Sequence, residues 1–362
     1  MSLDVQPTVE RPSPSGVLLE VDDLKTHFLT PRGRVKAVDG VSFTLDRGRT
    51  LGVVGESGSG KTILARSIMN LLPKLNVRRS GSVRFMGREL VGLDDGAMRE
   101  LLGTEIAMVF QDPLSSLNPV MTIGKQITEP LRLQVGMSRK EARLTAIALL
   151  RSVNIPEPEQ RFEEYPHLLS GGMRQRVMIA LALACGPKLL FADEPTTALD
   201  VTVQAQILNL LQDNQADRYM AMVLVTHDLG VVAGRTDEIA VMYGGRIVEQ
   251  APTSVLFSRM RHPYTEALLR SIPRVENPSH TRLEVIGGRP PDLINPPPGC
   301  AFSVRCPYAQ DDCRQEVPIL QEGAEFGHRF ACFHPLGGDG PAIPAPVTVT
   351  MKPPVDGHDP AG

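Results

Sequence analysis

Residues 55–62 read Gly55-Glu56-Ser57-Gly58-Ser59-Gly60-Lys61-Thr62 and fit the phosphate-binding P-loop pattern G-x-x-x-x-G-K-[ST]. The preceding residues 50–54 are mostly apolar, which predicts a buried strand, and residues 63–71 carry apolar side chains at helical spacing. Glycines allow such a loop to curl around an anion at a helix N-terminus, whose dipole favours negative charge. We therefore expect Lys61 to contact the β- and γ-phosphates of a nucleotide and Thr62 to bind Mg²⁺. A chance glycine-rich turn is the alternative, but it would not require a strand and a helix on either side.

The composition of the 362-residue chain is that of a folded soluble protein, with 42% hydrophobic and 22% charged residues. This length predicts about two domains. The formal net charge of −3 gives no reason to expect a nucleic-acid partner. Residues 1–16 lack an apolar core, so we expect no signal peptide, and no apolar run reaches the roughly 18 residues of a membrane span. The chain is therefore expected in the cytoplasm unless a partner holds it at a membrane.

A second motif is the apolar run of residues 189–192, which ends in Asp193 and Glu194. At the C-terminal end of a parallel strand, Asp193 is placed to hold Mg²⁺ through water. Glu194, next to the γ-phosphate, would orient or deprotonate the attacking water. Acids at a strand end can also be solvated turn residues, but the P-loop earlier in the chain favours the catalytic interpretation.

A third motif, residues 169–173, reads Leu-Ser-Gly-Gly-Met. Ser170 can cap the helix predicted to follow it, and Gly171 and Gly172 leave the N-terminus of that helix open. On its own this pattern is equally typical of an ordinary capped helix.

The order of apolar segments predicts an α/β P-loop domain. Further buried strands are expected at 106–110 and 221–225, with a helix at 203–212 completing a β-α-β unit and a closing hairpin at 238–249. An antiparallel β portion is expected near the N-terminus, and a helical subdomain at about 112–187. Residues 1–16 and 336–362 are expected to be disordered, residues 17–260 to form the ATPase domain, and residues 261–335 to form a Cys-containing C-terminal domain.

Taken together, the motifs resemble those of the nucleotide-binding subunits of ABC transporters, over about residues 18–250. The resemblance implies that Gln111 touches Mg²⁺ and senses a transmembrane partner, and that residues 169–173 are the signature motif. It also implies that Asp200 belongs to the D-loop, that His227 contacts the γ-phosphate, and that Phe28 stacks on adenine. Because a signature motif covers ATP bound to another subunit, the resemblance implies hydrolysis at a dimer interface.

Three stretches resemble the oligopeptide and dipeptide permease subfamily in particular. The commonest family form of the signature has Gln at the position of Met173, whereas this subfamily has Met there. Residues 112–119 and 261–265 also resemble the sequence pattern of the subfamily. The resemblance implies an ATPase that energises peptide uptake at the cytoplasmic face of the membrane, with nickel or another solute as the alternative cargo. Its implied partners are a second ATPase subunit, identical or a paralogue in a heterodimer, two transmembrane permease subunits and, indirectly, an extracytoplasmic solute-binding protein. A soluble ABC ATPase without transport function, or a sensory metalloprotein, are the alternatives from other classes.

Four of the five cysteines lie close together in sequence, at Cys300, Cys306, Cys313 and Cys332. Without a secretion signal, this clustering favours metal ligation over disulfides. The spacing is not that of a zinc ribbon, so a [4Fe–4S] cluster, zinc and four reduced buried thiols all remain open. The flanking residues resemble the metal-stapled extension of the same subfamily, which favours the [4Fe–4S] cluster, and His334 is a candidate substitute ligand.

Overall fold

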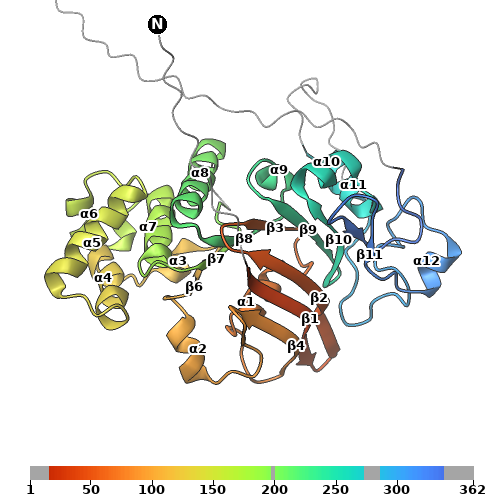
Figure 1. The fold of residues 1–362 in the computed structure, drawn as a ribbon, viewed down its shortest axis with the longest axis horizontal. Coiled ribbons are helices and arrows are strands. Elements are labelled where there is room, and N and C mark those ends of the chain that lie inside the picture. Colours follow the sequence, from red (N-terminus) through yellow and green to blue (C-terminus); the bar gives the residue numbers. More distant parts are fainter. Residues whose placement is uncertain (1–15, 197–199, 273–285, 338–362) are drawn as a thin grey trace, which may run out of the picture.

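The chain folds around an eight-stranded sheet with the order β11-β12-β10-β9-β3-β8-β7-β6 (Figure 1). The computed structural model describes residues 16–196, 200–272 and 286–337. The centre of the sheet is parallel and consists of β9 (Glu238–Tyr243), β3 (Thr50–Val54), β8 (Ala221–Thr226), β7 (Leu189–Asp193) and β6 (Ile106–Val109). The strands predicted from the sequence at these positions are confirmed. α8 (Val201–Arg218) connects β7 to β8, which confirms the predicted β-α-β unit.

Alternate residues of the central strands face two different hydrophobic clusters. In β7, Leu190 and Ala192 belong to one cluster, and Leu189 and Phe191 belong to the other. Because side chains alternate along a strand, the sheet is buried on both faces, which explains why its strands read as continuous apolar runs. All five residues of β7 are buried, including Asp193 at its C-terminal end.

A second, antiparallel sheet with the order β2-β1-β4-β5 covers one side of the central sheet. It consists of β1 (Val17–Thr30), β2 (Gly33–Asp46), β4 (Val77–Phe85) and β5 (Arg88–Glu89). The sequence pattern predicts a strand that starts at 18–21 and continues as an edge over 22–28, and the structure has one long strand there. Its register with both neighbours shifts near Asp22–Lys25, and Asp23 has a φ of 46°, so β1 contains a local irregularity there. α1 (Lys61–Ile68) packs between the two sheets, and α2 (Asp95–Leu101) follows β5.

The helical subdomain projects from one side of the molecule, as Figure 1 shows for α4 to α7. Its helices are α3 (Pro113–Ser116), α4 (Ile123–Leu133), α5 (Arg139–Ser152), α6 (Pro158–Glu163) and α7 (Gly171–Leu183), with a 3₁₀ turn at Pro166–Leu168. Ser138 and Glu141 form a capping box at the start of α5, which fixes where that helix begins. The helices pack against β6 and α8 through one shared core.

The C-terminal part of the chain continues the central sheet. The predicted hairpin is confirmed by β9 and β10 (Arg246–Pro252), and β10 then pairs with β12 (Arg329–Phe330), which pairs with β11 (Gln321–Glu322). α9 (Leu229–Val232), α10 (Thr253–Arg259), α11 (Pro263–Arg270) and α12 (Asp311–Gln315) complete the fold, the last three on the opposite side of the molecule from α4–α6 (Figure 1). A fully buried ion pair joins β10 to the residue before β12, with His328 Nε2 and Glu249 Oε1 2.8 Å apart.

Among the described residues, no helix has both the length and the apolar character needed to cross a bilayer. The predicted disordered ends fall almost entirely on residues 1–15 and 338–362, which lie outside the described ranges.

Candidate functional site

The P-loop lies between β3 and α1 and lines a cleft of about 680 Å³. From the loop, the cleft is lined by Glu56, Ser57, Gly58, Gly60, Lys61 and Thr62. It is also lined by three predicted site residues that follow other strands, Gln111, Glu194 and His227. Gly60, with a φ of 106°, precedes α1, and an added Cβ would lie 2.2 Å from the carbonyl oxygen of Ala37. Gly55 is equally restricted, because a Cβ there would lie 2.2 Å from the carbonyl oxygen of Met242. The backbone carbonyls of neighbouring segments therefore lie too close to the loop for any residue other than glycine at these two positions.

Lys61 is buried at the base of the cleft. Its Nζ donates to the carbonyl oxygens of Gly55 at 2.7 Å and Glu56 at 3.0 Å. Burial lowers the pKa of Lys61, whereas the carboxylates of Glu194, Asp193 and Glu56 act in the opposite direction. The ammonium group is thus held against loop carbonyls that it can exchange for phosphate oxygens.

Thr62 and Asp193 form a pair suited to a hard cation. Thr62 Oγ1 donates to Asp193 Oδ1 at 2.9 Å, and among the described residues no group bonds the buried Oδ2 of Asp193. Burial raises the pKa of Asp193, and the hydrogen bond from Thr62 partly offsets this. A buried carboxylate oxygen without a partner beside a hydroxyl fits Mg²⁺, which binds oxygen ligands and retains several waters.

Glu194 lies at the meeting point of three strand ends. Its Oε2 accepts from Gln111 Nε2 at 2.9 Å, and its Oε1 lies 3.3 Å from His227 Nδ1. Glu194 has a φ of 45°, and its N–H donates to the carbonyl oxygen of Val225 on the neighbouring strand at 2.9 Å. The structure therefore brings Gln111, Glu194 and His227 together at one edge of the sheet, as expected for residues that follow neighbouring parallel strands.

The signature residues lie elsewhere. Ser170 caps α7 by accepting from the N–H of Met173, and Asp200 caps α8 by accepting from the N–H of Val203. Gly172 lies beside α8, because an added Cβ would be 3.2 Å from Val203 Cγ1. None of Ser170, Gly171, Gly172 and Asp200 is among the described residues that line the P-loop cleft. Residues 198 and 199, next to Asp200, lie outside those ranges.

Phe28 is also not among the described residues that line the cleft. It lies in β1, where it pairs with Val35 of β2 and Val77 of β4. Its role in adenine stacking remains a prediction.

The structure adds lining residues that motif analysis did not identify. Leu268 and Ser271 reach the cleft from α11 and the residues after it, and Ile286 and Leu293 reach it from the segment that follows. No sequence pattern marks these positions, since they become neighbours of the P-loop only through the path of the C-terminal segment.

All four clustered cysteines line one small cavity of about 20 Å³. Burial raises the pKa of Cys300 and Cys306, and burial together with the three nearby thiols raises that of Cys332 to about 12. Four sulfurs around one cavity fit a metal or cluster bound by thiolates, whose positive charge would reverse these shifts. The apolar run at 178–185 predicts that Cys185 packs in the core, but it is only partly buried, with its sulfur 3.8 Å from Gln134 Oε1.

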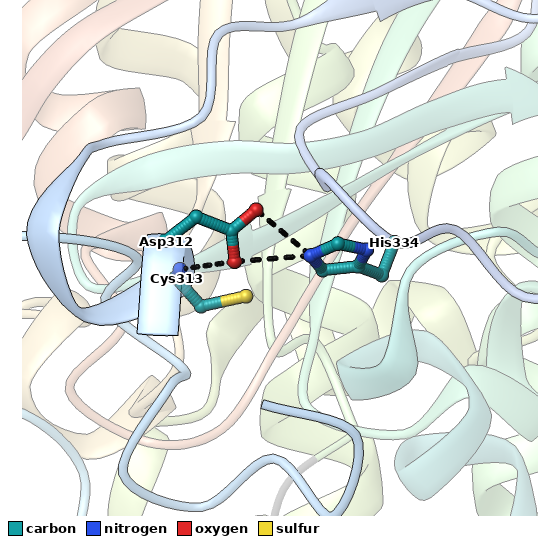
Figure 2. Close-up of side chains that lie close together, drawn as sticks. All are labelled: Asp312, Cys313 and His334. Carbon is teal, nitrogen blue, oxygen red and sulfur yellow. Dashed lines mark hydrogen bonds and ion pairs between the residues drawn. The ribbon is translucent and has the colours of Figure 1, made fainter. Parts of the chain in front are cut away.

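His334 lies beside this cavity. Figure 2 shows its imidazole facing the carboxylate of Asp312, and Nε2 lies 2.8 Å from Asp312 Oδ2. One ligand atom each of Asp312, Cys313 and His334 lie within 4.8 Å of one another. The histidine singled out from the sequence thus approaches the cysteine group through Cys313.

Comparisons with known proteins agree with this geometry. Residues 38–197 match the ABC transporter family, and residues 248–313 match the C-terminal region of oligopeptide/dipeptide transporters. The chain is 50% identical to a probable peptide ABC transporter ATP-binding protein of Sinorhizobium fredii, over 88% of this chain and 95% of that protein. It is 48% identical to the oligopeptide transport ATP-binding protein OppD of Salmonella typhimurium, over 93% of this chain and 99% of that protein. A solved dimeric ATP-binding cassette in a post-hydrolysis state with ADP and phosphate is similar with a TM-score of 0.59 and 27% identity, covering 65% of this chain and 98% of that one.

Proposed function

Because this chain belongs to the family of ATP-binding proteins of peptide ABC transporters, we propose that it hydrolyses ATP to drive the import of dipeptides and oligopeptides. The observation that carries this proposal is the P-loop cleft, in which Lys61 and Thr62 lie beside two acids at the end of β7. The match of residues 248–313 to the C-terminal region of oligopeptide/dipeptide transporters favours peptides over nickel or another solute.

The phosphate end of ATP is bound by residues of the P-loop. Lys61 and the N–H groups of residues 55–62 hold the β- and γ-phosphates, and Phe28 stacks on adenine. Thr62, Gln111 and Asp193 hold Mg²⁺, and the buried Oδ2 of Asp193 supports this assignment. When bound, Mg²⁺ neutralises charge that develops on the phosphate oxygens.

Glu194 and His227 perform the hydrolytic step. The carboxylate of Glu194 orients water and accepts its proton, and the 3.3 Å separation from His227 Nδ1 supports a shared role at the γ-phosphate. Gln111 bonds the same carboxylate, so movement of Gln111 changes the position of the base.

A second ATPase subunit completes the site. Ser170, Gly171 and Gly172 of one subunit cover ATP on the other, with Asp200 beside them; their separation from the P-loop cleft supports this arrangement. The second subunit is a paralogue, and two membrane permease subunits hold the pair at the cytoplasmic face of the membrane. A solute-binding protein delivers the peptide to those permease subunits. On this organisation residues 17–260 are the ATPase domain and residues 261–335 a C-terminal domain.

The cavity lined by Cys300, Cys306, Cys313 and Cys332 binds a [4Fe–4S] cluster, with zinc as the alternative. Four sulfurs around one cavity support a ligand set of four thiolates. A short segment with few apolar residues gains stability from such a staple.

Uptake by cells that lack this chain tests the proposal. Complementation with the wild type should restore uptake of a labelled tripeptide, whereas Glu194→Gln should not, and the exposed-site control Glu159→Gln should behave as the wild type. Uptake restored by Glu194→Gln would contradict ATP-driven import by this chain. Restoration of nickel uptake without tripeptide uptake would contradict the peptide assignment and favour the alternative cargo.

A further inference from the structure

The residue that directly precedes Cys306 forms a paired contact with the P-loop. Arg305 Nη1 donates to Glu56 Oε2 at 2.6 Å, and Nη2 donates to Glu56 Oε1 at 2.8 Å. The Arg305 side chain is only 3% exposed, although the two residues are 249 positions apart in sequence. Two parallel bonds from a buried guanidinium to a carboxylate fix both position and orientation.

The remaining donors of Arg305 are also engaged. Nε donates to the carbonyl oxygen of Gly287 at 2.8 Å, Nη2 donates to that of Ile286 at 3.1 Å, and Nη1 lies 3.2 Å from Tyr243 Oη. Ile286 itself lines the nucleotide cleft. Arg305 therefore connects the cysteine segment, a wall of the cleft and the P-loop through one side chain.

A second contact holds the backbone of Glu56. Its N–H donates to Tyr264 Oη at 2.8 Å. The Tyr264 ring packs against Tyr243 and Phe302 with centroid distances of 4.5 and 5.3 Å. Tyr264, Phe302 and Arg305 all follow the ATPase motifs in sequence. The C-terminal segment therefore positions Glu56 twice, through its main-chain N–H and through its carboxylate.

The charge of Glu56 gives this contact a consequence for nucleotide binding. Glu56 lines the cleft that holds Lys61, so its carboxylate lies near the site where ATP phosphates would bind. An unpaired carboxylate there would repel phosphate, and the repulsion would be strong because the site is partly shielded from water. The paired bonds from Arg305 neutralise that charge and fix the position of the carboxylate.

We propose that Arg305 is a positioning residue for the P-loop, which sets nucleotide affinity by neutralising and fixing Glu56. The inference rests on the proposed ATP-binding function of the cleft and adds that the segment after the ATPase motifs is part of the nucleotide site. Arg305 does not touch the reacting atoms, so its effect falls on nucleotide affinity and KM rather than on kcat.

Binding of a fluorescent ATP analogue to the purified full chain tests this role. Arg305→Met should raise the Kd about tenfold or more, since it leaves the Glu56 carboxylate unpaired, and the loss should shrink at high salt. In an ATPase assay, KM should rise while kcat at saturating ATP changes by less than about twofold. The matched control Arg314→Met removes a side chain that is 61% exposed and bonds only Asp311 among the described residues, so its Kd should equal that of the wild type.

A double variant separates neutralisation of Glu56 from a purely structural role. In the Arg305→Met background, Glu56→Gln removes the repelling charge and should recover most of the lost affinity. Should Arg305→Met fail to fold, Arg305→Lys retains the charge without the paired bonds and should give an intermediate Kd.

Each result bears on one proposal. An unchanged Kd in Arg305→Met, or a double variant as weak as Arg305→Met, would overturn the inference while leaving ATP binding intact. Failure of the wild type itself to bind the analogue would instead overturn the proposed function.

Discussion

Gln111 Nε2 donates to Glu194 Oε2 at 2.9 Å, although the two residues are 83 positions apart in sequence. They follow β6 and β7, which are neighbouring parallel strands. The start of the helical subdomain is thereby bonded directly to the proposed catalytic base. A movement of α3 and α4 would reach Glu194 through a single side chain.

Glu194→Gln should bind ATP and remain closed with it, but should lose turnover. The amide has nearly the same shape as the carboxylate and can still accept from Gln111, yet it cannot accept a proton from water. We expect hydrolysis to fall by about 100-fold or more, with the Kd for ATP within about twofold of the wild type. Phosphate release and analogue binding measure the two quantities. Wild-type hydrolysis in this variant would contradict the role, and the exposed Glu159→Gln is the matched control.

Lys61→Ala should abolish ATP binding. The buried ammonium group is bonded to the carbonyls of Gly55 and Glu56, and we expect it to exchange these partners for phosphate oxygens when ATP binds. We expect the Kd to rise by about 100-fold or more. Lys74→Ala removes a lysine that is 73% exposed and pairs with Asp95, so it should bind normally. Unchanged affinity in Lys61→Ala would remove the basis for a phosphate site at this loop.

Protein purified without oxygen should be brown and contain about four irons per chain. Serine at Cys306 should remove the colour and the iron, because one of the four thiolates is lost, whereas Cys185→Ser should retain both. Metal analysis and absorbance near about 400 nm are the measurements. Stoichiometric zinc without that absorbance would contradict the cluster and support the alternative ion.

Asp39→Asn should weaken the fold in a manner that depends on pH. Burial alone would raise the pKa of Asp39, but Arg246 at 2.6 Å and His27 at 2.9 Å outweigh burial and hold it below its usual value. A depressed carboxylate pKa stabilises the folded state above the unfolded value near pH 3.8, and this contribution is lost as the pH falls through the folded value. In urea unfolding, the free energy of unfolding of Asp39→Asn should therefore be about 2 kcal/mol below that of the wild type at pH 7. This difference should persist to about pH 5 and become smaller below about pH 4.

The control for this prediction is Asp311→Asn, which removes a carboxylate that is 92% exposed. A surface pair of this kind contributes about 0–1 kcal/mol, so little change is expected. A deficit in Asp39→Asn that stayed constant down to about pH 3 would show that titration of this carboxyl is not the cause.

Much of the central fold could be predicted because its signals are local. The strand at 50–54 matches β3 at both ends, and Ser170 caps α7 as expected from its position before two glycines. The meeting of Gln111, Glu194 and His227 was also predictable, since each follows a buried strand of the same parallel sheet.

The contributions of the C-terminal segment could not be predicted in the same way. The contacts of Arg305 and Tyr264 with Glu56 depend on a long path of chain with few regular elements, and an arginine before a cysteine carries no local signal. The strand β12 has only two residues, Arg329 and Phe330, too few to give an alternating pattern.

The pairing of β10 with β12 also limits how this protein can be shortened. Glu249 and Gln250 of β10 pair with Phe330 and Arg329 of β12. A chain cut after β10 would leave the backbone of Glu249 and Gln250 unpaired at the edge of the sheet. An exposed edge strand of this kind can pair with strands of other chains. The buried carboxylate of Glu249 would lose the imidazole of His328 at the same time. A truncated ATPase is therefore expected to aggregate, and any expression boundary chosen for crystallisation belongs beyond β12.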